Sequence, residues 1–306
     1  MLRTYDLVMT HKLDADDFFI HRVQEQCARR GLNFFLVEPE WVEAFYEKLA
    51  EGKIRVRALL NMHSEHHDRG ELYHRLVRLA DRQGARVIDP PDVALAAFNK
   101  AALHPRLEAA GIPVPPTLII PREHVQGLAL SDENHALLGS PFVIKPSLGY
   151  GRKGVLLDAT SASDLTRSVA AWPDAHYLLQ RRIVPRLIAG EPAYFRVYHV
   201  FGSLFFCWWN CFTDHYRALT TEERDRHGLE QLGETVRAIA SLTGMKFFST
   251  EIAQSEDGNF TAIDYVNDQC HLATQSAAPR NGVPDEIVAA IATHLVDGIA
   301  TELRRA

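Results

Sequence analysis

The strongest chemical signal in the sequence is a glycine-rich segment that follows a short apolar run. Lys145 closes the run Phe142–Lys145, and Gly149, Gly151 and Gly154 follow it closely. Glycine lets backbone N–H groups approach an anion without steric hindrance, and a lysine on the preceding strand adds a fixed positive charge. The pattern therefore predicts a loop that closes over phosphate groups.

Two common phosphate-binding motifs do not fit this segment. The glycines match the dinucleotide fingerprint G-x-G-x-x-G, but residues 155–157 read as a strand and not as the helix that the fingerprint requires. The P-loop pattern G-x-x-x-x-G-K-[ST] does not occur. The remaining interpretation is a hairpin lid, to which Ser147 adds a hydroxyl and Arg152 and Lys153 add charge. The alternative is a glycine-rich surface turn beside a basic patch.

A second polar group lies in the last quarter of the chain. Glu251 and Asp264 fall in two apolar runs, Phe247–Ala253 and Phe260–Val266, that read as a hairpin, and Asn267 follows the second run. Two carboxylates and an amide offer the oxygen ligands that Mg²⁺ prefers. Beside a phosphate-binding loop they would complete a nucleotide–metal site, whereas alone they could be a solvated hairpin end.

Other residues could contact a substrate. The histidines of loop 61–69 could bind a carboxylate, act as a base near neutral pH or be solvated, and a metal site formed by them is a minor alternative. The aromatic and basic segments could line an acceptor pocket or pack in the core, and Arg280 could hold an anionic substrate. These candidates are His63, His66, His67, Trp208–Asn210, His215–Arg217 and Arg280.

Hydrophobic periodicity predicts the elements that position these groups. The first third alternates strands and helices of similar length, which indicates a parallel sheet covered by helices. Ligands bind beyond the carboxyl ends of such strands, where loop 61–69 lies. The predicted strands are 5–9, 33–37, 54–62 and 86–89, and the predicted helices are 14–30, 41–50 and 71–83.

The remainder of the chain follows a proline-rich boundary. A predicted helix, Val93–Ala110, ends at Gly111, and Ile112–Pro116 must be extended because each proline disfavours helix in the residue before it. Strands and helices then mix without strict alternation. The predicted strands are 117–120, 142–145, 155–157, 177–180 and the hairpin 193–201/204–210, and the predicted helices are 161–171, 222–243 and 284–303.

Composition limits the class of protein. The 306 residues carry 33 Lys+Arg and 39 Asp+Glu, a net charge of −6, so we expect no general affinity for nucleic acid or for an anionic membrane. No apolar run reaches the length needed to span a bilayer. The cysteines are too few and too scattered for a disulfide framework, which favours a cytoplasmic location. They are Cys27, Cys207, Cys211 and Cys270.

Residues 99–269 resemble the ATP-grasp superfamily. The resemblance is carried by six segments that occur in the family's order, each of them loose alone but specific together. These segments are Asn99–Lys100, Leu107–Pro115 with its Gly-Ile-Pro-x-Pro ending, Lys145 with the glycine loop, Leu178–Ile183, Phe195–Val197, and Glu251 with Ile263–Asn267. The fold class that this implies is α/β, with an N-terminal Rossmann-like parallel sheet and an α+β nucleotide-binding part.

The resemblance also implies roles for individual residues. The two lysines would balance the α- and β-phosphates of ATP, and the loop residues would cover the phosphates. Arg196 would stabilise the transferring phosphoryl group, and the hinge would bind adenine. Two Mg²⁺ ions would be held by the carboxylates and the amide. The lysines are Lys100 and Lys145, and the loop residues are Ser147, Gly149, Gly151 and Gly154. The hinge residues are Gln180, Arg181, Arg182 and Ile183. The metal ligands are Glu251, Asp264 and Asn267, and Arg196 is the arginine named above.

Two departures from the family pattern lead to specific expectations. Asp264 precedes Asn267 by three residues where many members have two, so a β-bulge should accommodate the extra residue, with Asp268 as an alternative ligand. The hinge carries Gln180, Arg181 and Arg182 where an acidic residue is frequent, so Glu191 becomes the candidate ribose contact.

The family resemblance implies an ADP-forming carboxylate–amine ligase. It would activate a substrate carboxylate as an acyl phosphate and join it to an amine or a thiol. The alternatives are a kinase of the same fold and a nucleotide-binding protein without catalysis. We expect three units, 1–95, 96–176 and 177–306. The expected partners are carboxylate and amine substrates, small or peptidic, without nucleic acid or membrane, and a homodimer is the default assembly.

Overall fold

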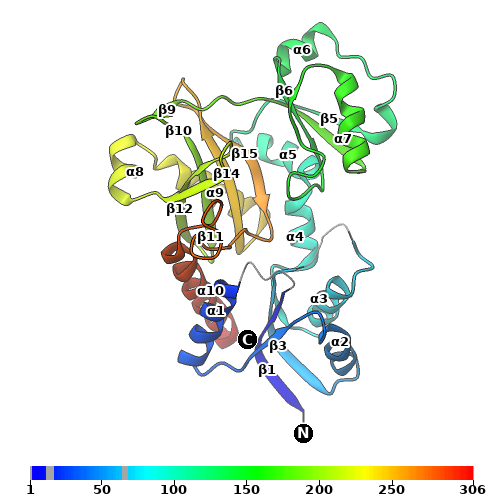
Figure 1. Ribbon diagram of the computed structural model, residues 1–306. Helices are drawn as coiled ribbons and strands as arrows, with labels where there is room; N and C mark the ends of the chain where they lie inside the picture. The colour runs from blue at the N-terminus through cyan, green and yellow to red at the C-terminus, as the bar shows by residue number, and fades with distance from the viewer. Residues whose placement is uncertain (1, 12–16, 64–67, 306) are drawn as a thin grey trace.

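The computed structural model describes residues 2–11, 17–63 and 68–305. Its first part is a four-stranded parallel sheet of order β2-β1-β3-β4 at the bottom of Figure 1. The parallel sheet predicted from the strand–helix alternation is therefore confirmed. The elements are β1 (Arg3–Thr10), α1 (Asp17–Arg29), β2 (Phe34–Val37), α2 (Val42–Ala50), β3 (Ile54–Asn61), α3 (Leu72–Arg82) and β4 (Arg86–Ile88).

Both faces of this sheet are covered, because successive side chains of a strand point to opposite sides. Val8 of β1 packs in a core with residues of α2 and α3. Leu7 and Met9 point the other way, into a core with α1 and with α10 (Asp285–Arg305), the last helix of the chain. The final helix thus completes the hydrophobic core of the first sheet.

The second part is a four-stranded antiparallel sheet of order β5-β8-β6-β7, at the top of Figure 1 with α6 and α7. Its core is formed by the inward residues of β6 and β8 against α6 and α7. The elements are β5 (Thr117–Pro121), the 3-10 turn η2 (Arg122–His124), α6 (Asp132–Leu138), β6 (Phe142–Pro146), β7 (Leu156–Ala159), η3 (Ala162–Asp164), α7 (Leu165–Ala171) and β8 (His176–Arg181).

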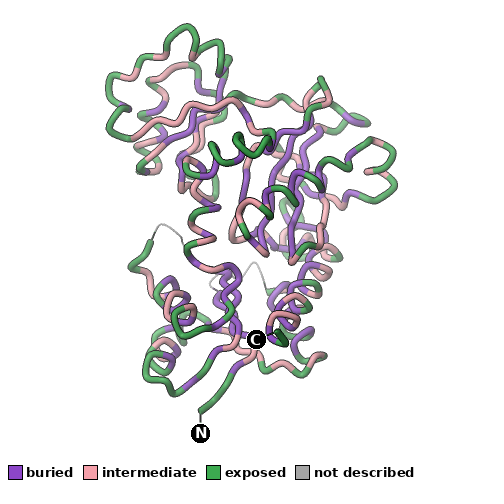
Figure 2. Tube along the Cα trace, turned by 180° about the vertical axis from the view of Figure 1, so that it is seen from behind, coloured by how far each residue is buried: buried purple, intermediate pink, exposed green. Residues whose placement is uncertain are grey.

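The third part is a five-stranded antiparallel sheet of order β13-β12-β11-β14-β15, followed in the chain by α10. The neighbouring strands β11 and β14 are buried at every position, and Figure 2 shows the buried strands of this sheet from behind. The elements are the ribbon β9 (Leu187–Ile188) and β10 (Glu191–Pro192), then β11 (Tyr194–Val200), β12 (Ser203–Asn210), β13 (His215–Ala218), α8 (Thr221–His227), α9 (Gln231–Thr243), β14 (Phe247–Gln254) and β15 (Phe260–Asn267).

Two helices that the periodicity predicts as continuous are each divided in two. The predicted helix over 93–110 is α4 (Pro91–Phe98) and α5 (Lys100–Ala109), because Asn99 is extended and its side chain accepts a hydrogen bond from the N–H of Ala102 at 3.1 Å. The predicted helix over 222–243 breaks at Gly228, which has φ +64° and ends α8. The break at Asn99 places Lys100 in the first turn of α5.

Asp89 joins the first sheet to the third. Its two carboxylate oxygens accept hydrogen bonds from the backbone N–H groups of Lys246 and Phe247, both at 2.9 Å, and the side chain is buried. Because these two buried donors would lose their acceptor, Asp89→Ala should lower the free energy of unfolding by about 3 kcal/mol. Urea denaturation would measure this loss. Asp89→Asn keeps one acceptor oxygen and should lose about half as much; an Ala variant as stable as the wild type would contradict the role.

Among the described residues, none of the helices combines the length and the apolar character needed to cross a bilayer.

Candidate functional site

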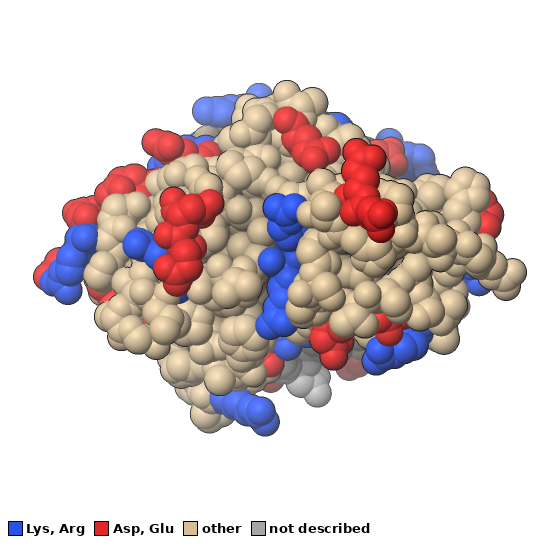
Figure 3. Space-filling view, turned by 90° about the horizontal axis from the view of Figure 1, so that it is seen from above, with Lys and Arg blue, Asp and Glu red and all other residues tan. Residues whose placement is uncertain are grey.

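A cavity of about 850 Å³ lies where the three sheets meet. Its lining comes from the residues just beyond β3, the start of α5, β6 and the glycine loop, the hinge at the end of β8, and the strands β11 to β15 with their connecting turns. Seen from above, Lys and Arg side chains form a row in the hollow between the two upper parts (Figure 3). The basic residues that line the cavity are Lys100, Lys145, Arg152, Arg181, Arg182 and Arg196.

The two lysines predicted to bind phosphate converge on one carboxylate. The ammonium of Lys100 lies 3.6 Å from Oδ1 of Asp264 and donates to the carbonyl oxygen of Gly149 at 3.3 Å. Lys145, on β6, donates to the carbonyl oxygen of Ile263 at 2.6 Å. Burial lowers the pKa of Lys145, while Asp264 and Glu251 act in the opposite direction. The pair forms a fixed positive region in the floor of the cavity.

The predicted β-bulge is present in the β14–β15 hairpin. Ser249 pairs with Asn267 and Glu251 pairs with Asp264, so two residues of β14 span the same length as three of β15. The extra residue returns Asn267 to the cavity side, and all three expected metal-binding residues line the cavity. Asp268 lines it too, so both residues expected as alternatives for one ligand position are present.

The carboxylate of Asp264 is suited to a cation. Burial opposes its ionisation, but Lys100 and Lys145 outweigh burial and lower its pKa. Its Oδ1 is buried without a hydrogen-bond partner. Among the described residues, no group of three or more His, Cys, Asp or Glu side chains is arranged to hold a metal ion. The expected set has two carboxylates and one amide, and Oδ1 of Asp264, which accepts no hydrogen bond and has Lys100 as its ion-pair partner, is the feature that fits a divalent cation.

Arg196 is held in the centre of the cavity wall. It forms an ion pair with Glu251 across the neighbouring strands β11 and β14, and both side chains are buried. Its guanidinium lies 5.2 Å from the ring centroid of Trp209 and 5.7 Å from that of Tyr216. Burial raises the pKa of Glu251, and Arg196 opposes this rise. Arg196 is thus an oriented cation beside the carboxylates.

The hinge residues divide between the cavity and the surrounding structure. Gln180, Arg181, Arg182 and Ile183 all line the cavity. The amide of Gln180 donates to the hydroxyl of Tyr265 at 2.6 Å, and the guanidinium of Arg181 donates to the carbonyl oxygens of Ala136 and Leu137 in α6. With these side chains occupied elsewhere, the hinge can offer backbone groups to a ligand.

The glycine loop has a tip that faces the cavity and two ends that are anchored. Gly149, Gly151 and Arg152 line the cavity, whereas Ser147 and Gly154 do not. The Ser147 hydroxyl donates to Oδ1 of Asn99 at 2.6 Å, which ties the loop to the start of α5. In this structure the Ser147 hydroxyl anchors the loop, and its expected role as a phosphate donor stays a prediction.

Gly154 anchors the other end by close packing. Its φ is +72°, and a Cβ at this position would lie 2.7 Å from Cβ of Trp172 and 2.8 Å from Cγ of Pro146. Only glycine fits such a site. In this structure Gly154 fixes the position of the loop, and its expected contact with phosphate stays a prediction.

The loop tip is latched to the opposite side of the cavity. The guanidinium of Arg152 pairs with Asp214, in the β12–β13 turn, at 2.7 Å and donates to the carbonyl oxygen of Cys211 at 3.2 Å. It also lies 5.9 Å from the ring centroid of Trp209. This contact holds the lid over the cavity.

The candidate ribose contact Glu191 does not line the cavity. It pairs with Arg217 at 3.2 Å on the exposed ribbon β9–β10. The sequence could not show which way Glu191 faces, because its strand is two residues long and carries no alternating pattern. Arg280 is also outside the lining, and its neighbour Asn281 takes that place.

Aromatic residues close the end of the cavity near the first sheet. Of the segments weighed as acceptor contacts, Trp209 and Tyr216 line the cavity, while Trp208 faces the other side of the sheet and packs on Phe195 at 4.8 Å. Tyr194, Phe212 and His271 also line it and were not expected from the sequence. The sequence shows that side chains alternate between the two faces of β11 and β12, but it does not show which of the two sets faces the cavity.

His63 brings the first sheet to the same cavity. It lies with Met62 just beyond the carboxyl end of β3, and both residues line the cavity, as expected for this loop. Its Nε2 lies 3.2 Å from Oε1 of Glu71. His66 and His67, the other histidines of this loop, lie outside the described residues.

Comparisons with known proteins agree with this architecture. No family model matches the chain, and no curated protein matches it in sequence. Among solved structures, D-alanine–D-alanine ligase from Bacillus anthracis in complex with ATP superposes with a TM-score of 0.66 at 14% identity, covering 100% of this chain and 98% of that chain.

Two further solved structures give the same result. A RimK domain ATP-grasp protein from Sphaerobacter thermophilus has a TM-score of 0.62 at 18% identity, covering 95% of this chain and 98% of that one. The ATP-grasp ligase PsnB, complexed with precursor peptide PsnA2 and AMPPNP, has a TM-score of 0.62 at 17% identity, covering 98% and 99%. At these identities the likeness shows the shared fold, and it confirms the fold expected from the sequence motifs.

Proposed function

We propose that this chain, which has the ATP-grasp fold, is an ATP- and Mg²⁺-dependent ligase that activates a carboxylate as an acyl phosphate and joins it to an amine or a thiol. The observation that carries the proposal is the convergence of Lys100, Lys145 and Arg196 with Glu251, Asp264 and Asn267 in one cavity. Solved structures of similar fold contain ATP or AMPPNP, which supports ATP as the nucleotide.

The residues of the cavity suit each part of ATP. The ammonium groups of Lys100 and Lys145 neutralise the phosphates, and backbone groups of residues 181–183 hold the adenine ring. Mg²⁺, two ions in this proposal, would be held by the carboxylates of Glu251 and Asp264 and the amide of Asn267 and would neutralise charge on the β- and γ-phosphates. Because these groups are fixed before the substrate arrives, little reorganisation is needed when charge moves.

The reaction proceeds in two displacements. A carboxylate oxygen of the substrate attacks the γ-phosphorus, and the bond from that phosphorus to the bridging oxygen breaks, which releases ADP. The amine or thiol then attacks the acyl carbon, phosphate leaves with the electron pair of the C–O bond, and the nucleophile loses a proton. Arg196 stabilises the transferring phosphoryl group, and the closed lid keeps water from hydrolysing the acyl phosphate.

The acceptor substrate occupies the aromatic end of the cavity in this proposal. Trp209 and Tyr216 offer flat apolar surfaces there, and the imidazole of His63, oriented by Glu71, is placed to hold a polar group or to accept a proton. The substrates are small molecules or peptides. The structure of PsnB with its precursor peptide supports the peptide class.

Trapping the acyl phosphate with hydroxylamine tests the proposal. Purified protein is incubated with ATP, Mg²⁺ and a panel of carboxylates, first with mixed amines and then with hydroxylamine. ADP release together with a hydroxamate supports the ligase. A phosphorylated alcohol without hydroxamate would show the kinase instead, and nucleotide binding without ADP release over the whole panel would show a binding protein.

The lid latch provides a further prediction. Arg152→Ala should raise the KM for ATP about three- to tenfold because the lid closes less often over the nucleotide, while the half-exposed pair contributes under about 1 kcal/mol to folding stability. Steady-state kinetics and thermal unfolding measure the two effects. Arg167→Ala, which removes an exposed arginine paired with Asp164 in the same part, is the control and should leave KM unchanged. Equal KM values for all three proteins would contradict the latch.

A further inference from the structure

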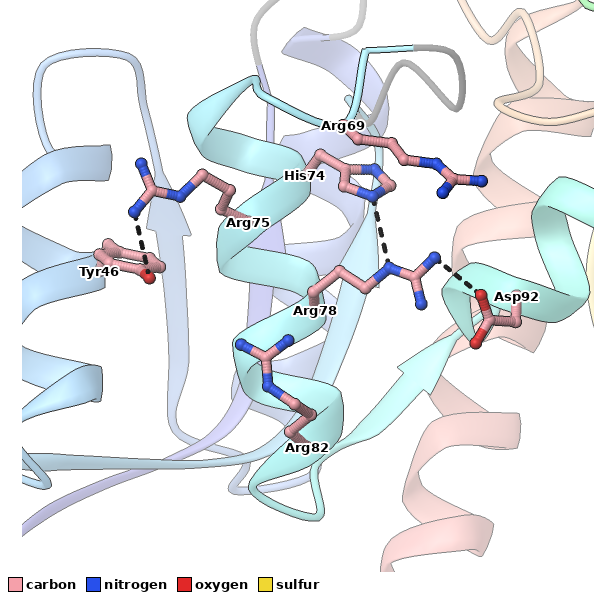
Figure 4. Close-up of a pocket in the computed structure, with 7 residues that line it drawn as sticks. All are labelled: Tyr46, Arg69, His74, Arg75, Arg78, Arg82 and Asp92. Atoms are coloured by element: carbon pink, nitrogen blue, oxygen red, sulfur yellow. Dashed lines mark hydrogen bonds and ion pairs between the residues drawn. The ribbon is translucent and has the colours of Figure 1, made fainter.

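A second hollow, of about 480 Å³, lies on the outer face of α3, away from the cavity of the proposed active site. Figure 4 shows its lining, which comes from α2, α3, the loop before α3, and α4. Four of its seven lining residues are arginines. The lining residues are Tyr46, Arg69, His74, Arg75, Arg78, Arg82 and Asp92.

Three of the arginines form a row on one face of the helix. Arg75, Arg78 and Arg82 are spaced three and four residues apart, which places them on neighbouring turns of the same side. The row extends over about 10 Å along the axis of α3. Arg69, from the preceding loop, lies beside the upper end of the row in Figure 4.

Two of these guanidinium groups are held in place by the protein. Nε of Arg78 donates to Nε2 of the buried His74 at 3.4 Å, and its terminal nitrogen lies 2.7 Å from Oδ1 of Asp92. Arg75 stacks on the ring of Tyr46 at 5.0 Å. A ligand that binds here meets donors that have already lost much of their side-chain freedom.

Among the residues that line the hollow, positive charge outweighs negative charge. Asp92 is the one acidic residue in the lining, and it is paired with Arg78. The nearby Glu71 is engaged in capping α3 and in its contact with His63. Within the described part of the chain, the side chains of Arg69 and Arg82 form no ion pair or hydrogen bond. The hollow thus carries an excess of positive charge on a protein whose net charge is −6.

The hollow is connected to the cavity by one short helix. Asp92 in the first turn of α4 lines the hollow, and Phe98 at the end of α4 lines the cavity. They are six positions apart in the helix, a distance of about 9 Å along the axis. An extended peptide of a few residues can cover such a distance.

We propose that the arginine row of α3 binds an acidic segment of a peptide substrate whose reacting group occupies the cavity. That the arginine row docks a substrate rests on the proposed function, whereas its binding of an acidic peptide does not. Guanidinium groups pair with carboxylates through two parallel hydrogen bonds, so Asp and Glu side chains at successive positions match the row. A nucleic acid would meet a protein that is acidic as a whole, which favours a peptide.

The binding of a fluorescein-labelled hexaglutamate peptide to the full-length protein tests the proposal. Fluorescence anisotropy should show saturable binding that weakens at high salt, because exposed ion pairs are screened. The double variant Arg75→Glu/Arg82→Glu should weaken this binding at least about tenfold. Thermal unfolding and ATP-analogue binding of the same variant confirm that it is folded.

Arg29→Glu is the matched control. Like Arg82, Arg29 is an exposed arginine at the end of a helix of the first part, but it lies outside the hollow. It should leave the affinity for the peptide within about twofold of that of the wild type.

Four results would overturn the proposal. They are the absence of binding by the wild type, equal losses for Arg29→Glu and the double variant, binding of a hexaglutamine peptide as tight as that of hexaglutamate, and displacement of the peptide by a single-stranded oligonucleotide at lower concentrations than by unlabelled hexaglutamate. ADP release is measured separately on the wild type. If the peptide binds at the arginine row and no ligase activity is found, the acidic-peptide site stands and the proposed function fails. If ligase activity is found without peptide binding, the site alone fails.

Discussion

Asp264→Asn is expected to reduce ADP release about a hundred- to a thousandfold while leaving the fold intact. The substitution keeps the shape of the side chain and removes one negative charge from the middle of the cavity. That charge is the partner of Lys100 at 3.6 Å, and it stabilises the ammonium of Lys145. Without it the amide also becomes a weaker ligand for Mg²⁺.

Titration of a non-hydrolysable ATP analogue with and without Mg²⁺ separates these effects. We expect wild-type binding to strengthen when Mg²⁺ is added and Asp264→Asn to lose most of this gain. Asp257→Asn is the control, because Asp257 is an exposed aspartate in the turn of the same hairpin. A variant at position 264 that retains both turnover and the Mg²⁺ effect would exclude the proposed metal site.

Lys145→Met should weaken ATP binding and reduce turnover, together by about a hundredfold or more. Methionine keeps the apolar stem and removes the ammonium group that lies against the carbonyl oxygen of Ile263. The cavity then has one fixed cation fewer facing the phosphates, and Asp264 loses one of the charges that lower its pKa. Isothermal titration with the ATP analogue and steady-state kinetics measure the two losses.

Lys153→Met is the matched control for this prediction. Lys153 belongs to the same glycine loop, but its ammonium lies 3.0 Å from the hydroxyl of Tyr150 and faces the ring of Trp172, outside the cavity lining. The loop keeps its glycine anchor, so ATP binding should change little. Losses of similar size at positions 145 and 153 would mean that only the general charge of the loop matters, and the specific role of Lys145 would be wrong.

Local sequence patterns were sufficient for much of the fold. Alternating strands and helices predicted the parallel sheet, and the spacing between Asp264 and Asn267, one residue longer than in many ATP-grasp proteins, predicted the bulge between them. Both depend on residues that are close in the chain. The breaks at Asn99 and Gly228 were missed because apolar periodicity continues across them while the backbone does not.

The site residues that could be predicted from the sequence are those on strands whose pairing partner could also be predicted. Lys145, Glu251 and Asp264 face the cavity because strand pairing fixes their side. Ser147 and Glu191 could not be placed from the sequence, since their partners Asn99 and Arg217 are brought to them by the tertiary fold. For Trp208 and Trp209, the sequence gives the alternation of the strand but not its phase.

The packing of the last helix against the first sheet has a consequence for biosynthesis. A ribosome releases β1 to β4 long before α10, yet one side of their sheet is completed by residues of α10 such as Leu295 and Ile299. The nascent chain therefore carries an uncovered apolar surface until α10 has been made. Shortened products that lack α10 should be captured by chaperones or degraded, and the first sheet and α10 should unfold as one cooperative unit.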